Sequence, residues 1–180
     1  MGKEKEATKD SIFTALIQLM EQKEYKYITV TDIARKSGVS RMTYYRTYSS
    51  KEDILVQYFR KTAQSMVSEA NGDAGRALSS FFSFFLEKSS IAKLLAQADL
   101  TKLLIECFSV LTDFLYEALH QDSWKEPENS YAARFESGGL FSILTRWLET
   151  GTKESPDDMA AITLKILKRQ DVHNPGVINL

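Results

Sequence analysis

The sequence predicts an all-α protein, and three observations lead to this fold class. Glycine and proline are scarce, with eight and three among 180 residues. Most of the chain consists of segments in which apolar residues recur every three or four positions, the spacing of an amphipathic helix. No segment alternates apolar and polar residues in the way that a half-buried strand does.

This spacing and the turn residues between the segments predict nine helices. Thr29, with Asp32 three residues later, is expected to cap the second helix. Gly38 is expected to end that helix in a left-handed conformation, and Ser40 to cap the third. The apolar face of the first helix comprises Ile12, Phe13, Leu16, Ile17, Leu19 and Met20. The nine helices are expected at residues 8–22, 30–37, 41–48, 51–70, 74–88, 91–98, 100–120, 128–149 and 156–170.

Composition predicts a protein of the cytoplasm without a membrane partner. Hydrophobic residues make up 43% and charged residues 26% of the chain, a balance typical of globular domains. The most apolar stretch, residues 81–86, is far shorter than the roughly 20 residues that cross a bilayer. No apolar signal-peptide core follows Met1. Cys107 is the single cysteine of the sequence, so an intrachain disulfide is excluded.

Charge is distributed unevenly along the chain. Residues 1–61 contain 12 Lys and Arg and 8 Asp and Glu, a net charge of +4. Residues 62–180 contain 11 Lys and Arg and 16 Asp and Glu, a net charge of −5. A basic N-terminal part suits contact with phosphate, and an acidic remainder does not.

Residues 28–55 carry the most informative pattern. Two helices of about two turns each meet at a tight turn centred on Gly38, and Ala34 is small where the helices must cross. This is the arrangement of a helix-turn-helix, whose second helix lies in the DNA major groove. The apolar residues spaced to share one core are Ile33, Val39, Tyr44 and Tyr48.

The second of these helices is expected to expose side chains that can read DNA. Arginine can donate two hydrogen bonds to guanine, and threonine can bond a base edge or touch a thymine methyl group. Hydroxyl groups and lysine suit phosphate oxygens. The side chains expected on this surface are Arg41, Met42, Thr43, Tyr45, Arg46 and Thr47, with Ser40, Tyr45 and Lys51 placed toward phosphate.

The segment from about residue 8 to residue 60 resembles the TetR family of bacterial repressors. The matching runs are Thr-x-x-Asp-Ile-Ala-x-x-Ser-Gly-Val-Ser at 29–40 and Thr-x-Tyr-x-x-Tyr-x-x-Lys-Glu-x-Ile/Leu from 43. The resemblance implies phosphate contacts from Thr29, Ser40, Tyr45 and Lys51. It implies base or near-base contacts from Thr31, Arg41, Met42, Thr43, Arg46 and Thr47. Tyr44 and Tyr48 replace the usual Phe, Leu or Val, and their hydroxyl groups are expected to reach water or a partner.

The resemblance also implies an architecture and a mechanism. A helix-turn-helix domain is expected at residues 1–50, a helical regulatory and dimerisation domain at 51–170, and a tail at 171–180. A homodimer would bind near-palindromic double-stranded operator DNA and act as a repressor. A small-molecule effector of unknown identity would release it by changing the spacing of the two DNA-binding heads.

The C-terminal helices resemble the family in architecture and length. Aromatic residues concentrate there and either line an apolar pocket or fill the core. The residues chosen for a pocket are Tyr58, Phe81, Phe85, Phe108 and Phe114. The last two helices are the expected dimer interface, with Phe135, Gly138, Gly139, Ile143, Trp147, Met159, Ile162 and Ile166. The pattern over 138–160 resembles a Gram-positive branch that includes a regulator linked to dihydroxyacetone kinase.

Enzymatic chemistry is not expected from this sequence. The two histidines, His120 and His173, form no group with metal-ligand spacing, so neither a metal nor a catalytic residue is assigned. No phosphate-binding glycine loop or nucleophile elbow occurs, and no cofactor is expected. One alternative stays open: a co-regulator that acts through a protein partner instead of binding the operator itself.

Overall fold

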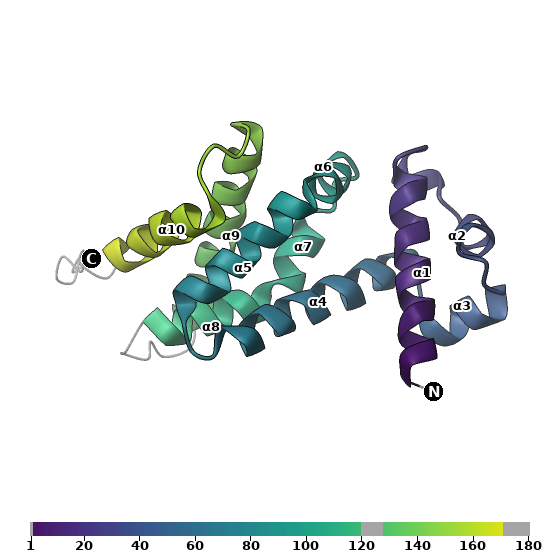
Figure 1. The fold of residues 1–180 in the computed structure, drawn as a ribbon, viewed down its shortest axis with the longest axis horizontal. Helices are drawn as coiled ribbons and strands as arrows, with labels where there is room; N and C mark the ends of the chain where they lie inside the picture. Colours follow the sequence, from purple (N-terminus) through teal and green to yellow (C-terminus); the bar gives the residue numbers. More distant parts are fainter. Residues whose placement is uncertain (1, 120–127, 171–180) are drawn as a thin grey trace. The chain divides into compact units, whose positions relative to one another are not determined.

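The computed structural model describes residues 2–119 and 128–170, and its regular structure in these ranges is entirely helical (Figure 1). The all-α prediction is therefore confirmed. The elements are α1 (Gly2–Met20), the 3-10 helix η1 (Tyr25–Tyr27), α2 (Val30–Ser37), α3 (Arg41–Thr47), α4 (Lys51–Ala70), α5 (Ala74–Glu87), α6 (Ser89–Gln97), α7 (Thr101–Cys107), α8 (Ser109–Leu119), α9 (Glu128–Glu149) and α10 (Pro156–Gln170). None of these helices has the length and apolar character of a membrane-crossing segment.

The chain divides into two compact units. One comprises residues 1–61 and 90–104, and the other comprises residues 62–89 and 105–180. The division falls inside α4, which runs without interruption from Lys51 to Ala70. The boundary expected after residue 50 stays a prediction, and the expected tail at 171–180 lies outside the described residues.

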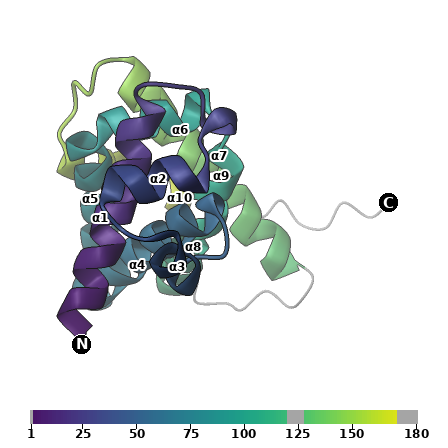
Figure 2. The same cartoon turned by 90° about the vertical axis from the view of Figure 1, so that its right-hand side faces the viewer.

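In the first unit, α1 packs on α2 and α2 packs on α3 (Figure 2). All six residues of the expected apolar face of α1 are buried. Phe13 stacks on Tyr58 with a distance of 3.6 Å between ring centres, and it meets Phe59 edge-on at 6.2 Å. Lys9 on α1 donates a hydrogen bond of 2.8 Å to Gln57. The first half of α4 is thereby fixed to α1.

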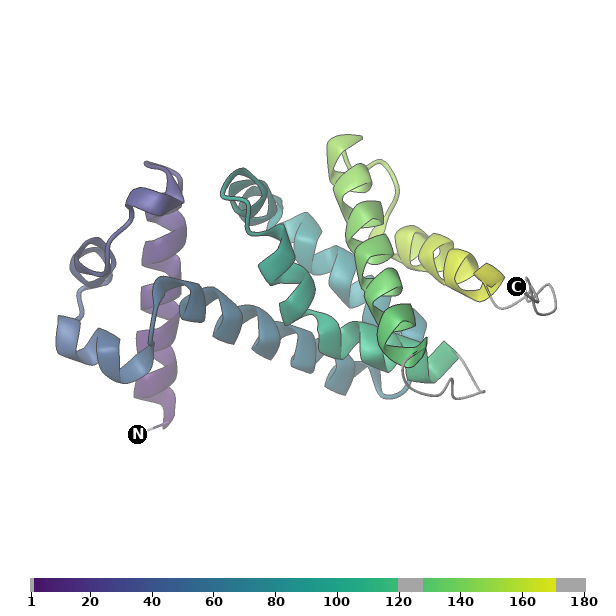
Figure 3. The same ribbon diagram turned by 180° about the vertical axis from the view of Figure 1, so that it is seen from behind.

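In the second unit, α5 lies along α10, and α8 packs on both α5 and α9 (Figure 3). Asp73 caps α5 by accepting a hydrogen bond of 3.0 Å from the backbone N–H of Arg76. The centre of this unit is a group of buried aromatic rings in mutual contact. Its members are Phe81, Phe82, Phe85, Phe108, Phe141 and Trp147.

The prediction of a single helix at residues 100–120 was wrong. The structure has two helices there, α7 and α8, which are separated at Phe108. The Phe108 carbonyl accepts hydrogen bonds from the backbone N–H groups of Leu111 and Thr112, at 3.0 and 3.2 Å, and so begins the new helix. Neither glycine nor proline marks this break, and apolar periodicity continues through it. The first helix also begins earlier than expected, at Gly2.

Candidate nucleic-acid interface

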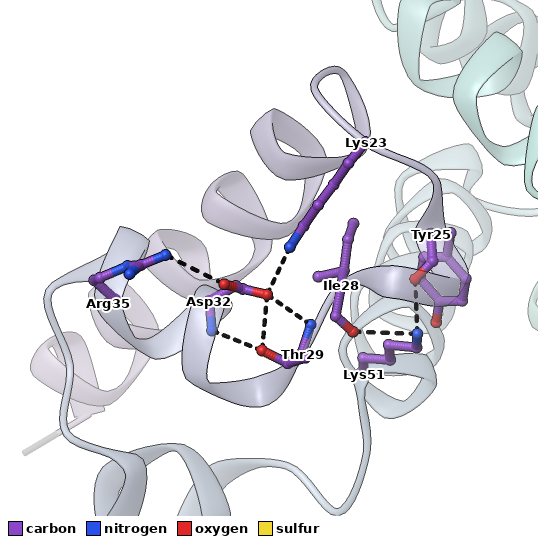
Figure 4. Close-up of polar contacts among 7 residues, drawn as sticks. All are labelled: Lys23, Tyr25, Ile28, Thr29, Asp32, Arg35 and Lys51. Atoms are coloured by element: carbon purple, nitrogen blue, oxygen red, sulfur yellow. Dashed lines mark hydrogen bonds and ion pairs between the residues drawn. The ribbon is translucent and has the colours of Figure 1, made fainter.

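The N-terminus of α2 is closed by a reciprocal pair of hydrogen bonds. The Thr29 hydroxyl oxygen accepts from the backbone N–H of Asp32 at 3.2 Å, and the Asp32 carboxylate accepts from the backbone N–H of Thr29 at 3.0 Å (Figure 4). The Thr29 hydroxyl also donates to this carboxylate at 2.7 Å. The expected cap is confirmed, and it fixes the Thr29 side chain where α2 begins.

Asp32 also ties α2 to the chain that follows α1. The Lys23 ammonium donates to Asp32 Oδ2 at 2.7 Å, and the Arg35 guanidinium lies 3.2 Å from Oδ1. The hydrogen bond from Lys23, followed by those from Thr29, holds the pKa of the Asp32 carboxyl well below its ordinary value. The carboxylate is therefore charged at neutral pH and acts as the centre of this network.

The turn between α2 and α3 has the backbone geometry that the sequence predicts. Gly38 has a φ of 73°, and its N–H points at the carbonyls of Ala34 and Arg35. This left-handed conformation costs glycine less than other residues. Ser40 then caps α3 by accepting a hydrogen bond of 3.0 Å from the backbone N–H of Thr43. The two helices of the helix-turn-helix are therefore set by local interactions.

The solvent-exposed side of α3 carries most of the residues expected to face DNA. Arg41, Met42, Tyr45 and Arg46 are exposed, with 74% of Met42 and 54% of Tyr45 accessible. Thr43 and Thr47 are half-buried. The Thr43 hydroxyl pairs with that of Ser40 at 2.9 Å, and the Thr47 hydroxyl donates to the Thr43 carbonyl. The side chains of Thr29, Thr31 and Ser40 are also exposed.

Lys51 has partners that the sequence did not reveal. Its ammonium donates hydrogen bonds to the backbone carbonyls of Tyr25 and Ile28, at 2.7 and 3.3 Å (Figure 4). The same ammonium lies 4.2 Å from the centre of the Tyr25 ring. The Tyr25 hydroxyl in turn donates to Glu52 at 2.9 Å. The first two residues of α4 therefore hold the segment that leads into α2.

Tyr44 and Tyr48 both belong to the core of this unit, as expected from their spacing. Tyr44 is fully buried, and its hydroxyl has no hydrogen-bond partner in the described part of the chain. The expectation that the Tyr44 hydroxyl reaches water or a partner was wrong for the described residues, because the ring lies inward from the exposed side of α3. Burial raises the pKa of Tyr44 to about 12.

The residues that the sequence predicts for an effector pocket lie in different surroundings. Phe81, Phe85 and Phe108 are fully buried, and their rings touch one another with centres 5.0 to 5.6 Å apart. Phe114 is half-buried on α8. Tyr58 belongs to the first unit, where it stacks on Phe13. The three phenylalanines thus form one cluster, and Tyr58 serves the attachment of α4 to α1.

The residues that the sequence predicts for a dimer interface divide into an exposed set and a buried set. Phe135 is 66% exposed, and Ile162 and Ile166 are exposed on α10. Gly138 and Gly139 are exposed on α9, and apart from their own helix nothing in the described part of the chain lies within 4 Å of where a Cβ atom would stand. By contrast, Trp147 and Met159 are buried within the single chain, and Ile143 is half-buried. Trp147 donates to the Glu154 carbonyl at 3.1 Å.

An unassigned exposed aromatic residue lies close to Phe135. Tyr131 is 72% exposed and stands one helical turn before Phe135 on α9, so the two share one side of that helix. The recurrence of aromatic residues four positions apart is the signal that could have found it. Among the described residues, no group of His, Cys, Asp and Glu is arranged to hold a metal ion.

Comparison with known proteins gives two family matches and several relatives. Residues 12–58 match the family described as bacterial regulatory proteins, tetR family, and residues 75–169 match a transcriptional regulator C-terminal region. The uncharacterized HTH-type transcriptional regulator YxbF of Bacillus subtilis (strain 168) is 23% identical over 171 residues. That alignment covers 89% of this chain and 44% of YxbF, so the chain spans less than half the length of this relative.

Two solved structures share the fold. The dihydroxyacetone kinase operon activator DhaS has a TM-score of 0.64 and 19% identity, with 91% of this chain and 95% of that chain covered. The transcriptional regulator FadR from Bacillus subtilis, solved in complex with stearoyl-CoA, has a TM-score of 0.61 and 20% identity, with 87% and 96% covered. Likeness at this level of identity shows the fold alone, so the branch of the dihydroxyacetone kinase regulator stays a prediction. The two family matches cover the helix-turn-helix and most of the remaining chain, and the chain belongs to the TetR family of bacterial regulatory proteins.

Proposed function

We propose that this protein is a sequence-specific DNA-binding regulator of transcription that places α3 in the major groove. The observation that carries the proposal is the division of α3 between an exposed side with Arg41, Met42, Tyr45 and Arg46 and a buried side with Tyr44. A short helix with two exposed arginines suits direct readout of bases. Within this arrangement, base or near-base contacts are assigned to Thr31, Arg41, Met42, Thr43, Arg46 and Thr47.

Phosphate contacts are assigned to residues around the helix ends. Thr29 and Ser40 stand at the N-termini of α2 and α3, where backbone N–H groups favour an anion. Tyr45 is exposed on α3 and carries a hydroxyl group. Lys51 is assigned here too, although two of its three N–H groups already donate to carbonyls.

The regulator acts as a homodimer in this proposal. Phe135, Ile162 and Ile166 are large apolar residues exposed on the neighbouring helices α9 and α10, and Gly138 and Gly139 leave room for a close approach. Large apolar side chains left exposed on both helices favour a protein interface. Because a twofold dimer presents two α3 helices, the operator is expected to be a near-palindrome with half-sites about one helical turn apart.

A small molecule with an apolar part is the effector in this proposal. The cluster of Phe81, Phe85 and Phe108 supplies aromatic surface that such a molecule could meet if the rings separate. The fold neighbour FadR was solved with stearoyl-CoA, which makes long-chain acyl-CoA a reasonable first compound in a thermal-shift screen. A role on DNA also favours a cytoplasmic location, which we include in the proposal.

Fluorescence anisotropy tests the central proposal. The protein is titrated into labelled DNA from upstream of its own gene and into a scrambled duplex, at two salt concentrations. Preferential binding that weakens steeply with salt supports an operator-binding regulator. Equal binding to both duplexes, together with capture of a specific protein partner, favours the co-regulator alternative. Whether the regulator represses, as most of the family does, or activates, as the name of DhaS states for that protein, needs a reporter assay.

A further inference from the structure

The turn formed by η1 exposes two side chains that the DNA-binding assignment leaves unused. Tyr27 is 62% exposed, and Lys26 is also exposed. Within the described part of the first unit, the exposed large hydrophobic side chains are those of Tyr27, Met42 and Tyr45. Met42 and Tyr45 lie on α3, the helix assigned to DNA. Tyr27 lies outside it and stands two residues before Thr29.

A short extended segment joins Tyr27, the last residue of η1, to Thr29. Ile28 and Thr29 both have extended dihedral angles, with φ and ψ of −76° and 123°, and −103° and 158°. Successive side chains of an extended segment point to opposite sides. The Ile28 side chain is buried, whereas its neighbours Tyr27 and Thr29 are both exposed. Thr29 is a residue that the proposed function places against phosphate.

Hydrogen bonds with the first two residues of α4 and within the turn itself hold the backbone of η1 in place. Lys51 donates to the carbonyls of Tyr25 and Ile28, at the two ends of the turn, and Tyr25 donates to Glu52. The N–H groups of Tyr27 and Ile28 close the turn onto the carbonyls of Glu24 and Tyr25, at 3.0 and 3.1 Å. A surface that is ordered before binding loses less conformational entropy when it binds.

The Lys26 ammonium can exchange its present carboxylate partner for another anion. The Lys26 ammonium lies 4.9 Å from the centre of the Tyr27 ring and 2.7 Å from the Glu24 carboxylate. The hydrogen bond to Glu24 raises the pKa of Lys26, so the ammonium keeps its charge at neutral pH. Because both partners are largely exposed, the ion pair is weak and another anion can replace the carboxylate.

We infer that the outward side of this turn, made of Lys26 and Tyr27, is a further DNA-backbone contact beside the one assigned to Thr29. The Lys26 ammonium leaves Glu24 for a phosphate oxygen, and the Tyr27 hydroxyl donates to the same or the next phosphate. The inference rests on the proposed function, since it extends the surface that approaches operator DNA. The net charge of +4 on residues 1–61 favours such a contact. Glu24 opposes it, because its carboxylate repels phosphate until the ammonium has moved.

Anisotropy titrations with single variants test this contact. The probe is the duplex that the full-length protein selects from a random DNA pool, and binding is measured over a range of salt concentrations. Lys26→Gln is expected to weaken binding about threefold to tenfold and to lower the salt slope by about 0.9, the value for one phosphate. Tyr27→Phe is expected to weaken binding about twofold to fivefold with the slope unchanged.

Glu24→Gln gives an expected result of the opposite sign. Removing this carboxylate frees Lys26 and removes a repulsion, so binding is expected to tighten. Lys153→Gln, at an exposed lysine of the second unit, is the matched control and is expected to bind as the unchanged protein does. Thermal melting of each variant verifies the fold, which these exposed changes should leave intact.

The possible results separate this inference from the proposed function. If Lys26→Gln and Tyr27→Phe bind like the unchanged protein while Arg41→Ala binds weakly, the turn does not contact DNA and the proposed function stands. If the unchanged protein selects no duplex at all, both the proposed function and the inference are overturned.

Discussion

The Lys51 ammonium lies 2.7 Å from the backbone carbonyl oxygen of Tyr25 and 4.2 Å from the centre of the Tyr25 ring. One side chain therefore holds both the backbone and the ring of the residue that begins η1. Because Thr29 follows this turn and caps α2, the first residue of α4 helps to position the start of the helix-turn-helix. A movement of α4 would therefore shift the position of Thr29 through this contact.

Lys51→Gln is expected to lower the free energy of unfolding by about 1–3 kcal/mol, the range for losing hydrogen bonds from a charged donor. It should also weaken binding to specific and scrambled DNA alike. Urea denaturation measures the first effect and anisotropy the second. A smaller salt slope would support the phosphate contact that the family resemblance implies, and an unchanged slope would mean that Lys51 acts by positioning.

Tyr44→Phe is expected to leave stability unchanged or to raise it by up to about 1 kcal/mol, because the buried hydroxyl has no hydrogen-bond partner among the described residues. Tyr25→Phe is the matched comparison, since it removes a hydroxyl that donates to Glu52 and should destabilise the protein. Urea denaturation at neutral pH compares the two. A large loss of stability in Tyr44→Phe would mean that its hydroxyl has a partner in solution.

Acid should weaken the first unit through Asp32. The folded pKa of this carboxyl is depressed by Lys23 and then by Thr29, so its contribution is present above the unfolded pKa of about 3.9 and is lost as the pH falls through the folded value. Asp32→Asn is therefore expected to flatten the stability profile between about pH 5 and pH 2. Lys23→Met should flatten it in the same direction. Identical profiles for all three proteins would contradict this role.

Much of the candidate interface could be predicted because its geometry is local. Thr29, Gly38 and Ser40 act on backbone groups within four residues of themselves, so their identity and spacing are sufficient to place α2 and α3. The exposed side of α3 follows from helical spacing alone. These elements are specified by the sequence at short range.

The features that escaped prediction depend on partners far along the chain or on backbone atoms. Lys51 meets carbonyl groups 23 and 26 residues away, and a carbonyl carries no residue signature. Trp147 contacts Phe82 and the Glu154 carbonyl within the chain, and its residue type alone did not indicate either partner. The break between α7 and α8 at Phe108 has no glycine or proline that would indicate it in the sequence. Tertiary packing decides each of these cases.

Arg41→Ala is expected to cost about 1–3 kcal/mol of operator affinity and to relax the sequence preference at one position, because a bidentate contact to guanine would be lost. Arg60→Ala, at an exposed arginine of the first unit outside α2 and α3, is the control. Binding to a set of operators with single base changes measures both affinity and preference. Equal losses for the two variants would argue against base readout by Arg41.

Phe135→Asp is expected to convert the proposed dimer to monomers, because it puts a charge on the exposed apolar side of α9. Operator binding should weaken with it, since a monomer presents one α3 helix to a two-part site. Leu86→Asp makes the same chemical change at an exposed apolar residue of α5 and should remain dimeric. Sedimentation velocity measures the mass of each variant. A dimeric Phe135→Asp protein would move the interface away from this side of α9 and leave Ile162 and Ile166 on α10 as the next residues to change.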